Sequence, residues 1–385
     1  MNASGHILSL RSAIPMKAES LVEPGVPKRG LFTEIRRSRL FFLLVVLATA
    51  ASIALMAGTS MAEDSAAETV AFVRQGDIWI AKVDGTGQRR LTDIGDCGGP
   101  ALSADARQVA FFCRTEKDLY PDTGFGQIYL VEAVGGKPRR MKFDGILAAE
   151  HPGFSSDGKS LVFVGLSEVR KDGIKDEARI YATMSVSIAD LKTGSTLNVL
   201  RHPGTMLDVG YIYSNPSFSP DGRLILWQES GSDVSGGFAL SDLKGKTLFR
   251  FPPKAEDLTP YWRPSLAPDG QTVLCYSPAT SEGSEDTIHL VDRKTGRLVD
   301  VTTGANPVFV RGGTAIVFER WVNRWSEKAS SHLWILELKP GATPKEIIPN
   351  ASEPAGAVLM PENSTGSTAV PSSENASQKG SNRQR

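Results

Sequence analysis

Several residues whose side chains could bind a ligand or a partner lie one or two positions before a proline that recurs along the chain. They are Glu150, His151, Asn215, Trp262, Arg263 and Asn306. Carboxylate, imidazole, amide and guanidinium groups donate or accept hydrogen bonds, and an indole adds a large apolar contact surface. If a repeated structural unit brings these positions together, they form a polar rim suited to binding a ligand or a partner protein.

A second candidate group occupies one short stretch of the chain. It consists of Arg320, Trp321, Arg324 and Trp325. Tryptophan and arginine carry a large share of the binding energy at protein interfaces, so this composition predicts a partner-binding loop. In the structural alternative, one tryptophan packs beneath the loop and the arginines are solvated. The mixed charges of residues 165–179 instead indicate a solvated hairpin.

Sequence signatures of catalysis are absent. The chain has no Gly-x-Ser-x-Gly elbow, no His-Glu-x-x-His motif, no paired Cys-x-x-Cys and no phosphate-binding glycine loop. His151 and His202 could approach each other and begin a metal site, but no third ligand of the same kind is evident. His289 takes a strand position that an aromatic residue fills in other repeats, which indicates a structural role. We therefore predict no catalytic residue, no metal site and no cofactor.

The elements that would position the candidate residues repeat along the chain. In the clearest copy, Asn215–Gln228, a proline-led strand is followed by Ser-Pro-Asp-Gly and then by an apolar strand. Proline, aspartate and glycine in this order form a tight turn, so the copy is a β-hairpin. The leading proline recurs at intervals of 43 to 64 residues, as Pro100, Pro152, Pro216, Pro264 and Pro307. Such spacing is typical of propellers and solenoids.

Each hairpin is followed by a third strand, a glycine-containing turn and a fourth strand, which predicts the four-stranded blade of a β-propeller. The first unit, Glu68–Asp93, lacks the proline-led strand, and Pro354 supplies one 47 residues after Pro307. The predicted fold is therefore all-β. It is a six-bladed propeller of four-stranded antiparallel blades, with the first blade closed by the C-terminal strand.

The Pro-x-Phe-Ser-Pro-Asp-Gly hairpin, an aromatic third strand and the Leu91-Thr92 strand resemble the WD-like repeats of TolB-type propellers over Glu68–Pro354. The resemblance implies a periplasmic binding protein of the cell envelope. The α/β domain that precedes the propeller in TolB has no counterpart between the export segment and the first blade. Similar repeats occur in prolyl-oligopeptidase-type peptidases and oligogalacturonate lyases. They imply an alternative, a metal-dependent lyase- or hydrolase-like enzyme with its site at the channel mouth.

Strand order separates the two faces of such a ring. The tight turns fall on one face, whereas the long connections between second and third strands and between blades fall on the other. Because binding residues concentrate on loops held by a rigid scaffold, we predict the site on this long-loop face. The alternative is that these loops merely tolerate insertions.

The N-terminal region carries an export signal. Three arginines, Arg36, Arg37 and Arg39, precede the uncharged run Leu40–Gly58, and a small-x-small sequence follows at residues 60–62. This pattern indicates a signal peptide or a single-pass anchor, and either places the body outside the cytoplasm. The predicted organisation is an export segment at 1–62, a propeller at 63–357 and a disordered polar tail at 358–385.

Charge and cysteine content complete the prediction. Residues 1–39 carry seven Lys/Arg and three Asp/Glu in a chain of zero net charge, so the body is mildly acidic and unsuited to nucleic acid. Cys97 and Cys113 each lie eight residues from Asp105, one before it and one after it. If the hairpin is regular, the two cysteines lie opposite each other and form either a disulfide or two buried thiols.

We expect a monomer that binds an envelope protein or polymer. It meets a membrane only through Leu40–Gly58, if the leader is uncleaved.

Overall fold

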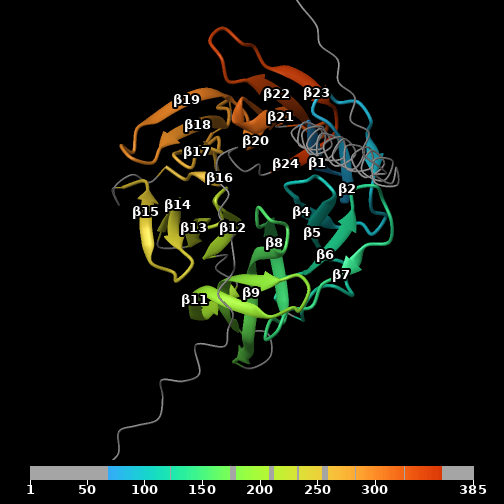
Figure 1. The fold of residues 1–385 in the computed structure, drawn as a ribbon, viewed down its shortest axis with the longest axis vertical. Coiled ribbons are helices and arrows are strands. Elements are labelled where there is room, and N and C mark those ends of the chain that lie inside the picture. Colours follow the sequence, from blue (N-terminus) through green and yellow to red (C-terminus); the bar gives the residue numbers. More distant parts are fainter. Residues whose placement is uncertain are drawn as a thin grey trace, which may run out of the picture. The chain divides into compact units, whose positions relative to one another are not determined.

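The computed structural model describes residues 68–357, except 122, 174–178, 208–211, 232–233, 254–258, 282 and 325. Six four-stranded antiparallel sheets are arranged as a ring (Figure 1), which confirms the predicted propeller. The predicted export segment, with its apolar run Leu40–Gly58, and the polar tail lie outside the described residues. Within the described part, no helix is long and apolar enough to cross a membrane.

Each blade contributes one strand to each of four layers, from the axis outward. The innermost strands are β24 (Ser352–Gly356), β4 (Cys97–Leu102), β8 (Ala148–Phe154), β12 (Tyr213–Phe218), β16 (Trp262–Leu266) and β20 (Ala305–Val310). The second strands are β1 (Thr69–Arg74), β5 (Gln108–Cys113), β9 (Ser160–Asp172), β13 (Leu224–Gly231), β17 (Thr272–Ser277) and β21 (Ala315–Val322). The third strands are β2 (Asp77–Lys82), β6 (Gln127–Glu132), β10 (Arg179–Asp190), β14 (Val234–Asp242), β18 (Thr287–Asp292) and β22 (Ser330–Glu337). The outer strands are β3 (Arg89–Arg90), β7 (Arg139–Arg140), β11 (Thr196–Met206), β15 (Thr247–Phe251), β19 (Leu298–Thr303) and β23 (Lys345–Ile348). Each of these four lists gives the strands of blades 1 to 6 in that order.

Blade 1 combines strands from both ends of the repeat region. β24 pairs antiparallel with β1, and Ala71 lies opposite Ala355 in this pairing. The pairing covers the edge of β1 that would otherwise be open. The C-terminal closure predicted from Pro354 is confirmed.

The core lies between neighbouring blades. The same position of the second strand holds a large buried aromatic side chain in five blades, namely Phe72, Phe111, Phe163, Trp227 and Phe318. In blade 5 the equivalent residue is Cys275, which lies opposite the buried His289. The His289 ring nitrogens are within hydrogen-bond distance of Ser277 Oγ (2.9 Å) and Asp300 Oδ1 (2.9 Å). His289 therefore packs as the structural residue that the sequence predicted.

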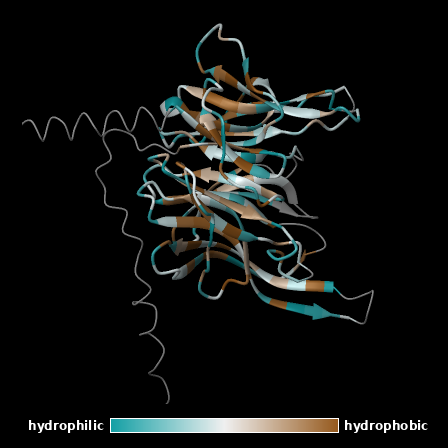
Figure 2. Cartoon of the chain, turned by 90° about the vertical axis from the view of Figure 1, so that its right-hand side faces the viewer, coloured by the Kyte–Doolittle hydropathy of each residue, from teal (hydrophilic) through white to brown (hydrophobic). Residues whose placement is uncertain are grey.

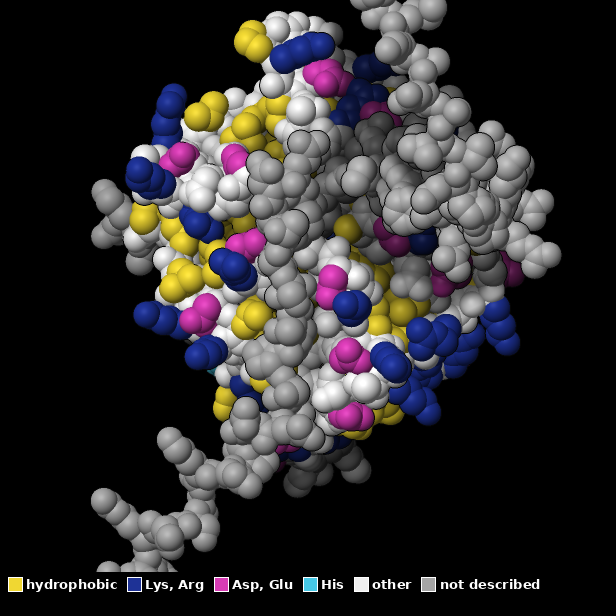
Figure 3. Space-filling view, viewed as in Figure 1, with side chains coloured by type: hydrophobic (Ala, Val, Ile, Leu, Met, Phe, Trp, Pro, Cys, Tyr) yellow, Lys and Arg dark blue, Asp and Glu magenta, His cyan; other side chains and the backbone are white. Residues whose placement is uncertain are grey.

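Blade 3 extends further than the others. β9 and β10 are 13 and 12 residues long, and their hairpin projects beyond the body when the ring is seen from the side (Figure 2). Residues 165–172 and 179 belong to this hairpin, as the sequence predicted, and its described tip is charged and exposed. On the face seen in Figure 3, acidic and basic side chains occur side by side over much of the described surface.

Cys97 and Cys113 form a disulfide between β4 and β5. The two residues are direct partners in the strand register, as the spacing around Asp105 predicted. Cys275 is a free and buried thiol. Burial raises its pKa far above the ordinary value, so this thiol is unreactive under physiological conditions.

Candidate binding site at the mouth of the central channel

Every innermost strand carries a β-bulge just before its proline. In blade 2, for example, the pairing register shifts between Gly98 and Ala101. The bulged residues have φ between 48° and 53° and are Gly99, His151, Asn215, Arg263, Asn306 and Glu353. All six line a central cavity of about 160 Å³, and we call them the mouth residues. Because a left-handed backbone is uncommon for residues with a side chain, the repeated bulge is the device that places five side chains around the mouth.

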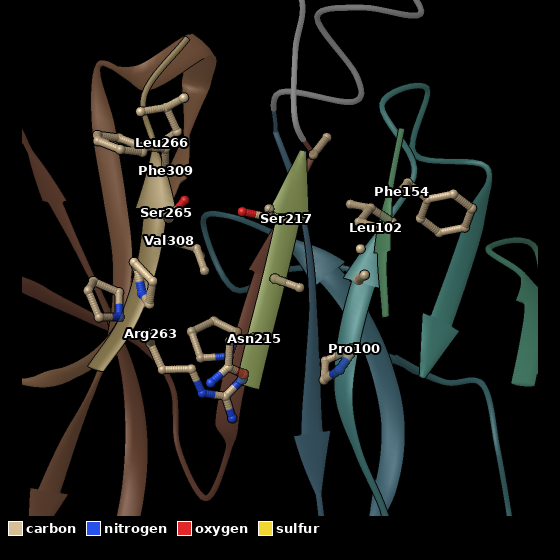
Figure 4. A pocket seen from close by; sticks show the side chains of 18 of the residues that line it. Pro100, Leu102, Phe154, Asn215, Ser217, Arg263, Ser265, Leu266, Val308 and Phe309 are labelled. Atoms are coloured by element: carbon tan, nitrogen blue, oxygen red, sulfur yellow. The ribbon is translucent and has the colours of Figure 1, made fainter. Parts of the chain in front are cut away.

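The channel changes character along its length. Figure 4 shows Asn215 and Arg263 at one end of it. Leu266 and Phe309 lie toward the other end, and Ser217 lies between the two groups. The mouth is therefore polar and the opposite end is apolar, so a ligand that enters from the mouth first meets hydrogen-bonding groups.

In three blades, one side chain of the second strand lies between the mouth residue of its own blade and the mouth residue of the next blade. In blade 4 it is Gln228, whose Oε1 accepts hydrogen bonds from Asn215 Nδ2 (3.1 Å) and from the backbone N–H of Arg263 (3.0 Å). In blade 6 it is Glu319, whose Oε1 accepts from Asn306 Nδ2 (2.7 Å) and from the N–H of Glu353 (2.5 Å). Each of these two side chains thus holds two consecutive mouth residues, and we call the arrangement the blade latch.

Blade 2 uses an aromatic ring at the same position. Phe112 packs edge-on against His151, the mouth residue of blade 3, with 5.2 Å between ring centroids. Its ring also fills the space above Gly99, where an added Cβ would lie 2.5 Å from Phe112 Cε1. Gly99 is thus required both by its positive φ and by this close approach.

Charged groups around the mouth are arranged in opposite-sign pairs. Arg263 Nη2 lies 3.4 Å from Glu353 Oε2, and Glu353 Oε2 also accepts the N–H of Gly99 (2.6 Å). Burial, followed by the nearby Arg263 and Arg114 guanidiniums, lowers the pKa of His151 to about 3. The imidazole is therefore neutral at physiological pH, and the charges at the mouth come from Arg263 and Glu353.

Glu150 was predicted to face a partner, and the structure corrects this. Its side chain is fully buried. Arg114 binds the carboxylate through Nε (2.7 Å) and Nη2 (2.6 Å), and the N–H of Gly126 donates a third hydrogen bond (2.7 Å). A buried carboxylate needs such partners, so Glu150 positions Arg114 beside His151 and makes no surface contact.

The predicted arginine–tryptophan stretch is divided between structural and exposed residues. Arg320 donates to Thr303 O (2.9 Å) and to Thr302 Oγ1 (2.9 Å), and its guanidinium lies over the Trp334 ring. Arg324 pairs with the buried Asp286 (2.7 Å). The arginines are therefore engaged, in contrast to the solvated arginines of the structural alternative.

One tryptophan of each candidate group is exposed on the long-loop face. Trp321 is 46% exposed, and Trp262, at the start of β16, is 37% exposed. Trp325 lies outside the described residues. Two indole surfaces in neighbouring blades therefore stand on the long-loop face, beside the polar mouth.

The two histidines considered for a metal site do not meet. His151 is on the innermost strand of blade 3 and His202 is on its outermost strand, with β9 and β10 between them. Three strand spacings separate them by about 14 Å. The described residues contain no group of three or more His, Cys, Asp or Glu side chains that could hold a metal ion.

Sequence reasoning predicted His151, Asn215, Arg263 and Asn306 at the mouth, and the structure places all four there. It missed the other two mouth residues, although both precede prolines of the repeat. These residues are Gly99 and Glu353. Arg114, Gln228 and Glu319 were also missed, because each of them binds at least one residue of the next blade.

Comparison with solved structures identifies the fold as a TolB-like propeller. The chain is similar to TolB from Acinetobacter baumannii, with a TM-score of 0.52 and 20% identity over 75% of this chain and 66% of that chain, just under two thirds of the TolB. A putative TolB from Agrobacterium tumefaciens gives a TM-score of 0.45 and 21% identity over 64% and 79% of the two chains. An oligogalacturonate lyase in complex with manganese gives 0.46 and 15% over 71% and 70%. No family model and no curated protein sequence matches the chain. At 20% identity, the similarity to the Acinetobacter baumannii TolB establishes the fold alone.

Proposed function

We propose that this protein is an extracytoplasmic, non-enzymatic binding module that holds a protein segment or an envelope polymer on its long-loop face. The observation that carries the proposal is where apolar side chains are exposed. Of the nine large apolar side chains exposed in the described chain, five belong to loops or strand ends of this face. They are Leu119, Leu147, Trp262, Trp321 and Val322.

The mouth residues add the polar component of such a surface. Arg263 and Glu353 present one charge of each sign, and Asn215 and Asn306 present amides. Interfaces between proteins combine exposed aromatic anchors with a polar surround in this way. A ligand with backbone amides or hydroxyl groups would find both donors and acceptors at the mouth.

Export is supported by the sequence before the propeller. The basic residues and apolar run of segment 1–62 have the pattern of a signal peptide or anchor. A disulfide between Cys97 and Cys113 agrees with an oxidising compartment. We propose a monomer that acts in the periplasm or an equivalent extracytoplasmic space.

Affinity capture with the full chain tests the proposal. The double variant Trp262→Ala/Trp321→Ala removes both exposed indoles of the long-loop face. The matched control, Leu248→Ala/Val299→Ala, removes two exposed apolar side chains from the outer strands β15 and β19. Wild type and control should retain the same envelope component, and the double variant should lose it. Retention of every component by the double variant would contradict the proposal.

A further inference from the structure

A second cavity lies apart from the central channel, between blades 5 and 6. Its volume is about 280 Å³. It is lined by the loop before β18, the connection from β19 to β20 and the end of β21. The side chains that matter below are Glu285, Asp286, Glu319, Arg320, Trp321 and Arg324. We call it the blade 5–6 pocket, and it shares no lining residue with the channel.

The walls of this pocket are fixed before any ligand arrives. Asp286 is 4% exposed; its Oδ1 accepts the N–H of Ala279 (2.8 Å) and its Oδ2 pairs with Arg324 (2.7 Å). Arg320 is held by its hydrogen bonds to Thr302 and Thr303, the last two residues of β19 in blade 5. Pre-positioned polar groups reduce the entropy lost when a ligand binds.

Trp321 supplies an apolar surface on one wall. Trp321 is nearly half exposed, and the Arg324 guanidinium lies over the indole ring, 5.9 Å from its centroid. An exposed indole beside a hydrogen-bonding pair is suited to a ligand that has a flat apolar face and polar edges.

The pocket is lined by charged side chains of both signs. Arg320 and Arg324 are positive, and Glu285 and Asp286 are negative. Burial raises the pKa of the remaining carboxyl, Glu319, which favours its neutral form. A strongly charged ligand of either sign would therefore meet like charges, whereas a neutral ligand can use donors and acceptors together.

Neighbouring hydroxyl groups of a ligand can form hydrogen bonds with both members of the Asp286–Arg324 pair. A hydroxyl group both donates and accepts, the carboxylate only accepts, and the guanidinium only donates. Two adjacent ring hydroxyls can thus bind the pair side by side. The cavity is slightly smaller than the range usual for drug-sized ligands, which favours a single ring.

We propose that the blade 5–6 pocket binds one ring of a neutral saccharide, stacked on Trp321 and hydrogen-bonded by Asp286 and Arg324. This inference rests on the proposed function, since it identifies the polymer as a glycan and assigns it a subsite on the long-loop face. The channel mouth remains available to the rest of the partner.

Calorimetric titration of the full chain tests the pocket with three soluble probes. Chitotriose is neutral, the glucosamine trimer has the same linkage but is cationic, and trigalacturonate is anionic. Chitotriose should bind with a Kd in the millimolar range or below. Trp321→Ala should weaken it about tenfold by removing the stacking surface, and Leu248→Ala, on the outer strand β15, should leave it unchanged.

Absence of heat with chitotriose at about 10 mM would overturn the inference, as would equal affinity in Trp321→Ala. Tighter binding of either charged trimer would overturn the argument from charge. If Trp262→Ala alone abolishes capture of an envelope component while no saccharide binds, the pocket assignment fails and the proposed function stands. Saccharide binding together with partner capture that is indifferent to both tryptophans would refute the proposed function instead.

Discussion

Replacing Glu319 with alanine should destabilise the propeller more than any other single change at the mouth. The carboxylate is buried and accepts hydrogen bonds from Asn306 Nδ2, Ser331 Oγ (2.8 Å) and the N–H of Glu353. Glu353 belongs to β24, the strand that closes the ring. Alanine would leave two amide donors without their acceptor in a buried site, and each unsatisfied donor costs about 1–3 kcal/mol. We expect a loss of about 2–6 kcal/mol.

Thermal unfolding followed by circular dichroism measures this loss. For a domain of this size a loss of 1 kcal/mol lowers Tm by about 2–4 °C, so Glu319→Ala should lower it by roughly 10 °C. The matched control is Glu319→Gln, because Gln228 already performs the same role in blade 4. Glutamine keeps the accepting oxygen and should stay within about 1 kcal/mol of wild type.

Wild type and Glu319→Gln should differ in how their stability depends on pH. Burial raises the pKa of Glu319 above its ordinary value of 4.5. The stability that this carboxyl contributes is present below the unfolded pKa and is lost as pH rises through the folded pKa. Glu319→Gln cannot ionise, so its stability relative to wild type should increase as pH rises above about 4.5. If alanine has no effect, or if glutamine is as harmful as alanine, the blade latch does not hold the closing strand.

Three further predictions concern the disulfide of blade 2 and two of the mouth residues. Cys97→Ser should cost about 3 kcal/mol in urea unfolding, given the 16-residue separation of the disulfide, and thiol titration of unfolded, unreduced wild type should detect only Cys275; three thiols would contradict the disulfide. Gly99→Ala should cost about 1–3 kcal/mol in the same assay, because its Cβ would clash with an aromatic ring, and an unchanged midpoint would refute that packing. Arg263→Ala should raise the pKa of His151 above about 3, measured by NMR titration of the imidazole; a lower or equal pKa would contradict the charge arrangement.

The fold was predictable because its signals are local. Proline fixes φ and removes a backbone donor, and Asp-Gly sequences turn the chain, so each hairpin is encoded within a dozen residues. Pro354 made the closing strand visible for the same reason. The greater length of β9 and β10 was less visible, since charged residues occur in exposed strands as well as in loops.

The site was predictable only where it follows the repeat. Asn215 and Arg263 were found through their prolines, and the same rule applied to Glu353 would have found the opposite charge of the mouth. Glu150 was assigned to the surface because its partner, Arg114, comes from another blade. Such pairings depend on the register and contact of distant strands, which a single sequence does not encode locally.

The central claim is that partners bind the long-loop face. Site-specific photo-cross-linking in cells that export the full chain tests it most directly, with the cross-linker placed in turn at positions 262, 321, 134 and 248. Val134, in the tight turn after β6, and Leu248, on β15, are exposed apolar residues away from this face. We predict a defined adduct from 262 and 321 and none from 134 and 248. Adducts from 134 or 248 alone, or none from any position, would contradict the proposed function.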